Sequence, residues 1–100
     1  MNIKPSELAA MFGKELGQQD KKDIGQQIVV LDRGFVYVGN VELDNHFVWI
    51  TKAKNIRIWG TTKGLGELRN GPLSATKLDE AGEVLAPLKS VIHFISCKGF

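Results

Sequence analysis

The sequence predicts a mainly β protein, a small SH3-like or Sm-like barrel of five to seven short antiparallel strands with a short N-terminal helix. Runs of β-branched and aromatic residues recur between residues 28 and 97, and glycine-containing turns separate them at short intervals. Between these runs the chain lacks the crossover helices that a parallel sheet would need. With 100 residues, the chain is expected to form a single domain with one core.

An N-terminal amphipathic helix is expected over residues 6–16. Ser6 is suited to cap its start, apolar residues follow at helical spacing up to Leu16, and Gly17 is suited to end it. Residues 17–27 are polar and aperiodic, so we expect a linker there. The barrel itself is expected over residues 28–97.

The first three strands are expected to form a meander. Residues 28–31 and 35–43 flank a tight connection that ends in glycine, and residues 46–52 follow a second turn. Gly39 lies inside the middle strand, where it permits the bulge or sharp bend that a small barrel needs. Trp49, among apolar neighbours in the third strand, is expected in the core.

The next strand is expected over residues 56–59. Alternation places Ile56 and Ile58 on one face and Arg57 and Trp59 on the other. If the isoleucines face the core, the cation and the aromatic ring face outward together.

The remaining elements are expected to be short. A helical turn over residues 66–70 is followed by strands over 76–78 and 83–85. A turn or 3₁₀ segment over residues 87–90 then precedes the last strand, over 91–97.

Residues 57–72 form the segment whose composition best suits a ligand, because they are rich in glycine, hydroxyl groups and positive charge. Glycine lets backbone N–H groups turn toward an anion, and nearby cations add attraction. We expect these groups to hold phosphates while Trp59 stacks on a base. The candidate ligand-binding residues are Arg57, Trp59, Thr61, Thr62, Lys63, Gly64, Arg69 and Asn70. The spacing is not that of a Walker A loop.

The same segment also fits a purely structural role. A wide surface loop uses glycine for its turns, and Trp59 at a strand end is suited to cover one end of a barrel. Both interpretations stay open at this point.

Charge and composition narrow the classes of partner. The net charge of +2 is too small to indicate nucleic-acid binding by itself, although residues 52–69 contain five basic residues and one acidic residue. No apolar run approaches the roughly 20 residues that span a bilayer, and the first residues do not resemble a secretory signal. We therefore expect a cytoplasmic protein that does not act at a membrane.

No catalytic or metal-binding constellation is recognisable. His46 and His93 have no cysteine or acidic residue at metal-ligand spacing, and the serines lack a nucleophile motif. We expect a non-enzymatic protein without a metal or cofactor. Cys97, in an apolar run, is expected to be a small buried thiol.

Three segments resemble a family of small tailed-phage and prophage proteins that carries no established activity. They are Gly34-Phe-Val-Tyr-Val-Gly39, Ala53-Lys-Asn-Ile-Arg-Ile-Trp59 and Gly60-Thr-Thr-Lys-Gly-Leu-Gly-Glu-Leu68. The resemblance covers roughly residues 28–97. It implies a viral origin, a shared fold and a location in the host cell cytoplasm, and it assigns no site residues.

Together these observations predict a phage-type binding protein that captures an anionic small ligand, such as a nucleotide that signals host defence. One alternative is a homo-oligomeric structural protein, or an anti-defence protein that binds a host protein. A second alternative is a nucleic-acid-binding module that uses the basic residues between Lys52 and Arg69.

Overall fold

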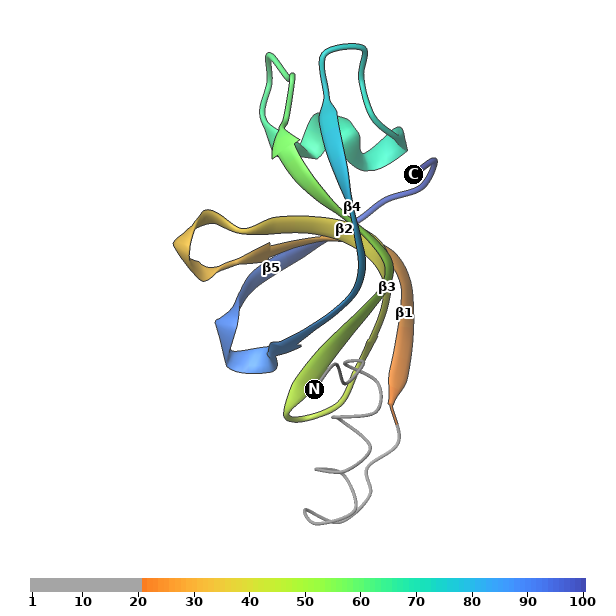
Figure 1. Cartoon of the computed structure of the whole chain (residues 1–100), viewed down its shortest axis with the longest axis vertical. Helices are drawn as coiled ribbons and strands as arrows, with labels where there is room; N and C mark the ends of the chain where they lie inside the picture. The colour runs from red at the N-terminus through yellow and green to blue at the C-terminus, as the bar shows by residue number, and fades with distance from the viewer. Residues whose placement is uncertain (1–20) are drawn as a thin grey trace.

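The computed structural model describes residues 21–100, which form one five-stranded antiparallel sheet in the order β4-β3-β2-β1-β5 (Figure 1). The strands are β1 (Lys22–Leu31), β2 (Val36–Leu43), β3 (Phe47–Ile58), β4 (Lys77–Pro87) and β5 (Val91–Ser96). Three short 3₁₀ helices connect them: η1 (Asp32–Gly34), η2 (Leu65–Asn70) and η3 (Leu88–Ser90). The mainly β, antiparallel prediction is confirmed. The sheet of residues 21–100 does not close into the barrel that the sequence predicts, because β4 and β5 end the sheet without pairing with each other.

The first strand begins earlier than the sequence indicated, so the linker expected over residues 17–27 is wrong from Lys22 onward. Residues 22–27 pair with β2, with Lys22 opposite Leu43 and Gln27 opposite Gly39. The polar side chains find partners within the sheet, since the buried Gln27 amide donates to the Ile24 carbonyl at 2.7 Å. The helix expected over residues 6–16 lies outside the described residues.

Both β3 and β4 are continuous where the sequence indicated two separate strands each. The predicted breaks coincide with shifts in the β3–β4 pairing register around Ala53, which lies opposite Gly82. Lys52 and Gly82 have positive φ angles of 51° and 73° at this point. These residues interrupt the alternation of side chains, but the ladder continues on both sides of them.

Gly39 produces the bend that the sequence predicts. A β-carbon added there would lie 2.7 Å from the Thr51 carbonyl oxygen and 2.8 Å from Cγ2 of Ile50. The β2–β3 register shifts between Val38 and Asn40. Only a glycine lets the two backbones approach this closely, and the bend curls the sheet over its own core.

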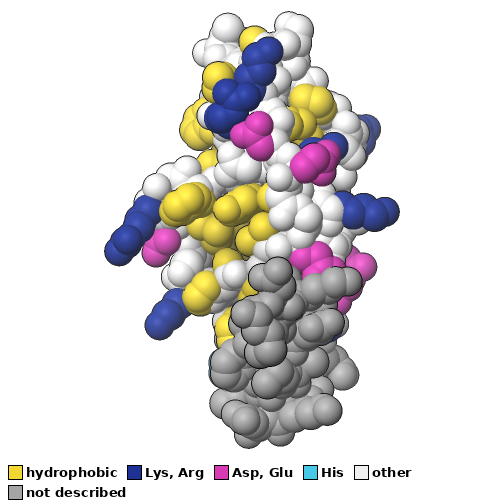
Figure 2. Space-filling view, in the orientation of Figure 1, with side chains coloured by type: hydrophobic (Ala, Val, Ile, Leu, Met, Phe, Trp, Pro, Cys, Tyr) yellow, Lys and Arg dark blue, Asp and Glu magenta, His cyan; other side chains and the backbone are white. Residues whose placement is uncertain are grey.

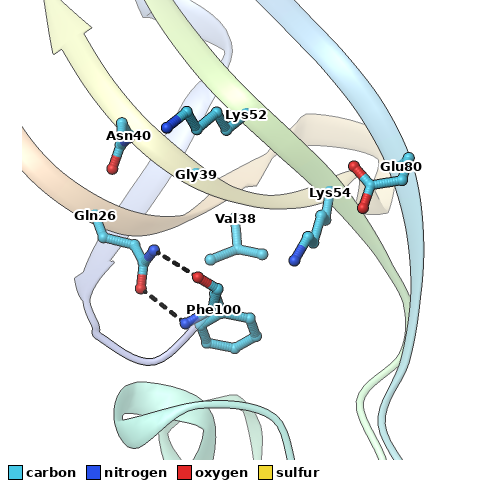
Figure 3. Close-up of a pocket in the computed structure, with 8 residues that line it drawn as sticks. All are labelled: Gln26, Val38, Gly39, Asn40, Lys52, Lys54, Glu80 and Phe100. Carbon is cyan, nitrogen blue, oxygen red and sulfur yellow. Dashed lines mark hydrogen bonds between the residues drawn. The ribbon is translucent and has the colours of Figure 1, made fainter.

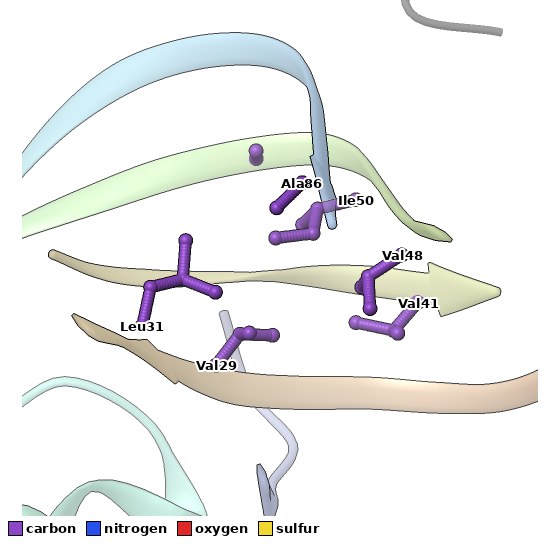
Figure 4. Packing of buried hydrophobic residues seen from close by; sticks show 7 residues of the cluster. Val29, Leu31, Val41, Val48, Ile50 and Ala86 are labelled. Carbon is purple, nitrogen blue, oxygen red and sulfur yellow. The ribbon is translucent and has the colours of Figure 1, made fainter. Parts of the chain in front are cut away.

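The sheet buries apolar side chains on both faces, since neighbours in β1 such as Ile28 and Val29 belong to different clusters. The first cluster lies inside the curled sheet (Figure 4) and comprises Val29, Leu31, Val41, Val48, Ile50, Ala53 and Ala86. The second cluster contains η2 residues and comprises Ile28, Val36, Val38, Ile56, Leu65 and Leu68. Phe100 and Cys97 of the C-terminal tail pack against this second cluster.

The side-chain predictions for β3 are confirmed in part. Trp49 is in the core, with 6% of its surface exposed, and Ile56 is buried as expected. Ile58 is instead 48% exposed, because the β3–β4 register shifts between Ile56 and Ile58 and the alternation ends there. The predicted short helical segments before β4 and β5 correspond to η2 and η3.

Candidate anion-binding site

The glycine-rich loop between β3 and η2 holds an anion that the chain itself provides. The Glu67 carboxylate accepts hydrogen bonds from the backbone N–H groups of Thr62, at 3.3 Å, and Lys63, at 2.9 Å. The Thr62 hydroxyl donates to the same carboxylate at 3.0 Å. The N–H groups of this loop therefore donate to an anion, and that anion is a side chain of η2.

The pKa of Glu67 agrees with these hydrogen bonds. Desolvation acts to raise the pKa of Glu67, but hydrogen bonds from Thr62 and Lys63, together with the Lys63 charge, lower it overall. The hydrogen bonds favour the ionised carboxylate. Any external anion bound to the same N–H groups would have to displace Glu67.

Arg57 and Trp59 are both exposed, but Ile58 between them is exposed too, so the alternation that predicted a shared outer face does not extend to Trp59. Arg57 forms an ion pair with Asp79 of β4, with 2.9 Å between Nε and Oδ2. Trp59 is 42% exposed, and its backbone carbonyl accepts a hydrogen bond from the Thr76 hydroxyl at 2.7 Å. The guanidinium charge is thus already paired, while the indole surface remains partly open to solvent.

The other predicted residues lie around η2. Thr61 is half-buried in the loop, and the Gly64 carbonyl accepts a hydrogen bond from the Glu67 N–H at 3.2 Å. Arg69 and Asn70 line a shallow pocket of about 280 Å³ together with the C-terminal tail. The tail lies against η2 here, since the Lys98 N–H donates to the Arg69 carbonyl at 2.9 Å.

A larger pocket of about 420 Å³ lies on the same face of the sheet as the second apolar cluster (Figure 3). Four strands and the C-terminal tail contribute to it. It is lined by Gln26, Val38, Gly39, Asn40, Lys52, Lys54, Glu80 and Phe100. None of these residues belongs to the predicted small-ligand site, and Lys52 and Lys54 were expected to act only in the nucleic-acid alternative.

Two lysines give this pocket its charge. Lys52 extends toward Asn40, and Lys54 extends toward Val38 (Figure 3). Neither ammonium forms an ion pair within residues 21–100, although Lys54 lies directly opposite Glu80 in the β3–β4 ladder. With Glu80 as the one acidic residue of the lining, the pocket has an excess of one positive charge.

The backbone of β3 is distorted at this pocket. Lys52 adopts a φ of 51°, a left-handed conformation that is unfavourable for a residue with a side chain. Gly39 directly lines the pocket and allows β2 to pass close to Thr51. The bend that curls the sheet therefore also positions the two lysines.

The C-terminal tail forms an apolar wall beside the lysines. The Gln26 side chain anchors it by donating to the Phe100 carbonyl at 3.3 Å and accepting from the Phe100 N–H at 3.2 Å (Figure 3). The Cys97 thiol lies 3.9 Å from Oε1 of the same glutamine. Desolvation by burial raises the pKa of Cys97 to about 11, so the thiol stays protonated near neutral pH.

Sequence reasoning missed this pocket for identifiable reasons. Lys52 and Lys54 were counted within a basic strip, but the strip does not act as one surface. Arg57 is paired with Asp79, and Lys63 lies near Glu67, whereas Lys52 and Lys54 face a pocket. Lys52 and Lys54 are two residues apart, a spacing that is typical of side chains on one face of a strand, and Gly39 lies in the neighbouring strand. This pattern was the feature of the sequence that could have indicated the pocket.

The described part of the chain contains neither a candidate metal site nor a candidate membrane-spanning helix. No group of three or more His, Cys, Asp or Glu side chains in residues 21–100 is arranged to hold a metal ion. None of the helices described there is long and apolar enough to cross a membrane. No protein-family model matches the chain, and neither a curated protein nor a solved structure shows significant similarity to it.

Proposed function

We propose that this protein is a non-enzymatic binding module that captures an anionic small ligand, of the nucleotide class, in the pocket of Lys52 and Lys54. The observation that carries the proposal is that two lysines without ion pairs in the described chain project into one pocket. The proposal keeps the ligand class that the sequence predicts and moves its main contacts from the loop to the pocket.

The size and lining of the pocket support this class of ligand. A volume of about 420 Å³ lies in the range of small-molecule sites, which is roughly 300–1,000 Å³. Two ammonium groups suit a phosphate, and the Asn40 amide adds hydrogen-bonding capacity. The half-buried Phe100 ring offers an apolar surface for a base.

The loop supports the proposal less directly. Its N–H groups satisfy Glu67, so an external phosphate would gain only the difference between its own contacts and those of the carboxylate. A phosphate at Lys52 and Lys54 displaces no ion pair formed by residues 21–100. The pocket is therefore the better place for capture.

The biological setting and the finer fold type belong to the same proposal. A phage origin, action on a host defence signal and a host-cytoplasmic location depend on the sequence resemblance described above. The 3₁₀ helix before β5 and the bent β2–β3 pair support an open variant of the SH3-like or Sm-like arrangement.

A thermal-shift screen tests the proposal, since a ligand that binds only the folded state raises the apparent Tm. The probes are inorganic phosphate, nucleoside mono- and diphosphates, cyclic nucleotides and a short single-stranded oligonucleotide. We expect at least one nucleotide to raise Tm in the wild-type protein and to lose its effect in Lys52→Ala and Lys54→Ala.

Matched variants distinguish the alternatives. Lys22→Ala removes an exposed lysine outside the pocket and should keep the full shift. Lys63→Ala should also keep it, because Lys63 belongs to the loop. A shift produced by the oligonucleotide alone and abolished by moderate salt would instead indicate a nucleic-acid-binding module.

A further inference from the structure

The sheet has two free edges within residues 21–100. β4 pairs only with β3, and β5 pairs only with β1, so each has one side without a neighbouring strand. The two strands follow each other in the chain through η3, and the sheet stays open between them (Figure 1). Unpaired backbone N–H and C=O groups along such edges are a template for another strand.

The β5 strand itself lacks the usual charged or proline protection against such pairing, and η2 covers only its C-terminal end, where the Lys98 N–H donates to the Arg69 carbonyl at 2.9 Å. Its sequence, Val91-Ile-His-Phe-Ile-Ser96, has no lysine, acidic residue or proline. Cys97 donates its N–H to Gln26 of the β1 side. By strand alternation, the N–H groups of Phe94 and Ser96 point away from β1, toward the open side. The outer residue Ile92 has 62% of its surface exposed.

Within residues 21–100, the open side also leaves part of the first apolar cluster without a covering element. Four side chains from β4, η3 and β5 pack against that cluster but are only half-buried: Val84, Leu88, Val91 and Phe94. An apolar area lies between β4 and β5 in the space-filling view (Figure 2). A strand added here would cover apolar surface as well as satisfy backbone groups.

The charges along the two edges are complementary. β4 carries one lysine, Lys77, and three acidic residues, Asp79, Glu80 and Glu83. The segment from Leu88 to Lys98 carries two lysines, Lys89 and Lys98, and no acidic residue. Asp79 is already paired with Arg57 of β3 and adds little to this match. β4 is still the more acidic of the two edges and fits the edge that carries Lys89 and Lys98 when two copies meet.

We propose that the free edge of β5 pairs with the free edge of β4 in a second copy of this chain. The contact uses two different surfaces of each copy, so it is heterologous. Such a contact leaves one free edge at each end of the assembly, and copies therefore add until a ring closes or a filament grows. This interface does not use Lys52 or Lys54 of the proposed ligand pocket, but it shares Glu80, which lies on β4 and lines that pocket.

The mass of the full-length protein, measured by size-exclusion chromatography with light scattering over a concentration series, tests the proposal. We expect an assembly of two or more copies. Ile92→Lys, which places a charge on the exposed β5 edge, should reduce the assembly to a monomer with an unchanged circular dichroism spectrum. Leu73→Lys changes an exposed apolar residue in the loop before β4 and should leave the assembly intact.

Hydrogen exchange provides a second readout at the edge itself. The amides of Phe94 and Ser96 should become more protected as protein concentration rises, and the protection should disappear in Ile92→Lys. A wild-type monomer at all concentrations, with or without protected β5 amides, overturns the proposal. A dimer in which only the β5 amides become protected also overturns it, because two copies joined through β5 alone leave β4 unused. A dimer that protects β4 and β5 amides alike is a two-membered ring and supports the pairing. If Ile92→Lys keeps the full assembly, the proposal is also overturned.

Discussion

Substitution of Gly39 by alanine should destabilise the protein because β2 and β3 cross closely there. The new β-carbon would lie 2.7 Å from the Thr51 carbonyl oxygen, 2.8 Å from Cγ2 of Ile50 and 3.2 Å from the Ala53 α-carbon. Two of these three atoms belong to the backbone and cannot rotate away. Relief therefore requires the two strands to separate by a few tenths of an ångström.

The expected loss of stability follows from two opposing effects. Overpacking of this kind costs about 1–3 kcal/mol. Replacing glycine by alanine also lowers the entropy of the unfolded chain, which returns about 0.4–1 kcal/mol. The net decrease in the free energy of unfolding is then about 1–2 kcal/mol, which corresponds to a decrease in Tm of about 5–15 °C for a domain of this size.

Urea unfolding followed by tryptophan fluorescence measures this effect, since Trp49 is buried in the core. Gly66→Ala is the matched control, because a β-carbon at Gly66 meets nothing within 4 Å. We expect the control to be as stable as the wild type or slightly more stable. If Gly39→Ala matches Gly66→Ala in its unfolding midpoint, the close β2–β3 crossing is refuted.

Two further predictions concern ionisable groups. The pKa of Glu67 is lowered in the folded state from the ordinary value of 4.5, so its contribution to stability is present above about pH 4.5 and is lost as the pH falls through the folded pKa. The stability difference between wild type and Glu67→Gln should therefore shrink on acidification below pH 4.5, and a constant difference would contradict the carboxylate's role in the loop. Cys97, with its pKa raised to about 11, should react slowly with iodoacetamide at pH 8 and quickly in denaturant; equal rates would contradict its burial.

The sequence predicts the strand regions and the bend but not the way they join. β-branched and aromatic runs marked parts of β1, β2 and β3, and Gly39 marked the bend. The early part of β1 escaped detection because its polar residues, such as Gln27, are satisfied by hydrogen bonds that depend on the folded sheet. The continuity of β4 escaped because Gly82 interrupts its alternation without ending its pairing.

The candidate site, like the fold, could be predicted from the sequence only in part. Composition indicated that the loop after β3 suits an anion, and the N–H groups of Thr62 and Lys63 donate to a carboxylate of the same chain. Composition could not show that Glu67, four residues from Lys63, already fills that position. The pocket joins Gln26, Lys52 and Phe100, which are distant in sequence, and only the strand register brings them together.

The central claim is that Lys52 and Lys54 bind the phosphate of an anionic ligand, and isothermal titration tests it most directly. The titrant is the nucleotide that gives the largest thermal shift, and the proteins are wild type, Lys52→Ala, Lys54→Ala and Lys63→Ala. A hydrogen bond to a charged group contributes about 1.5–3 kcal/mol, so each pocket variant should weaken Kd by roughly 10- to 100-fold. Lys63→Ala should change Kd less than about twofold. Weakened binding in Lys63→Ala, with wild-type Kd in both pocket variants, would contradict the claim and place the ligand in the loop.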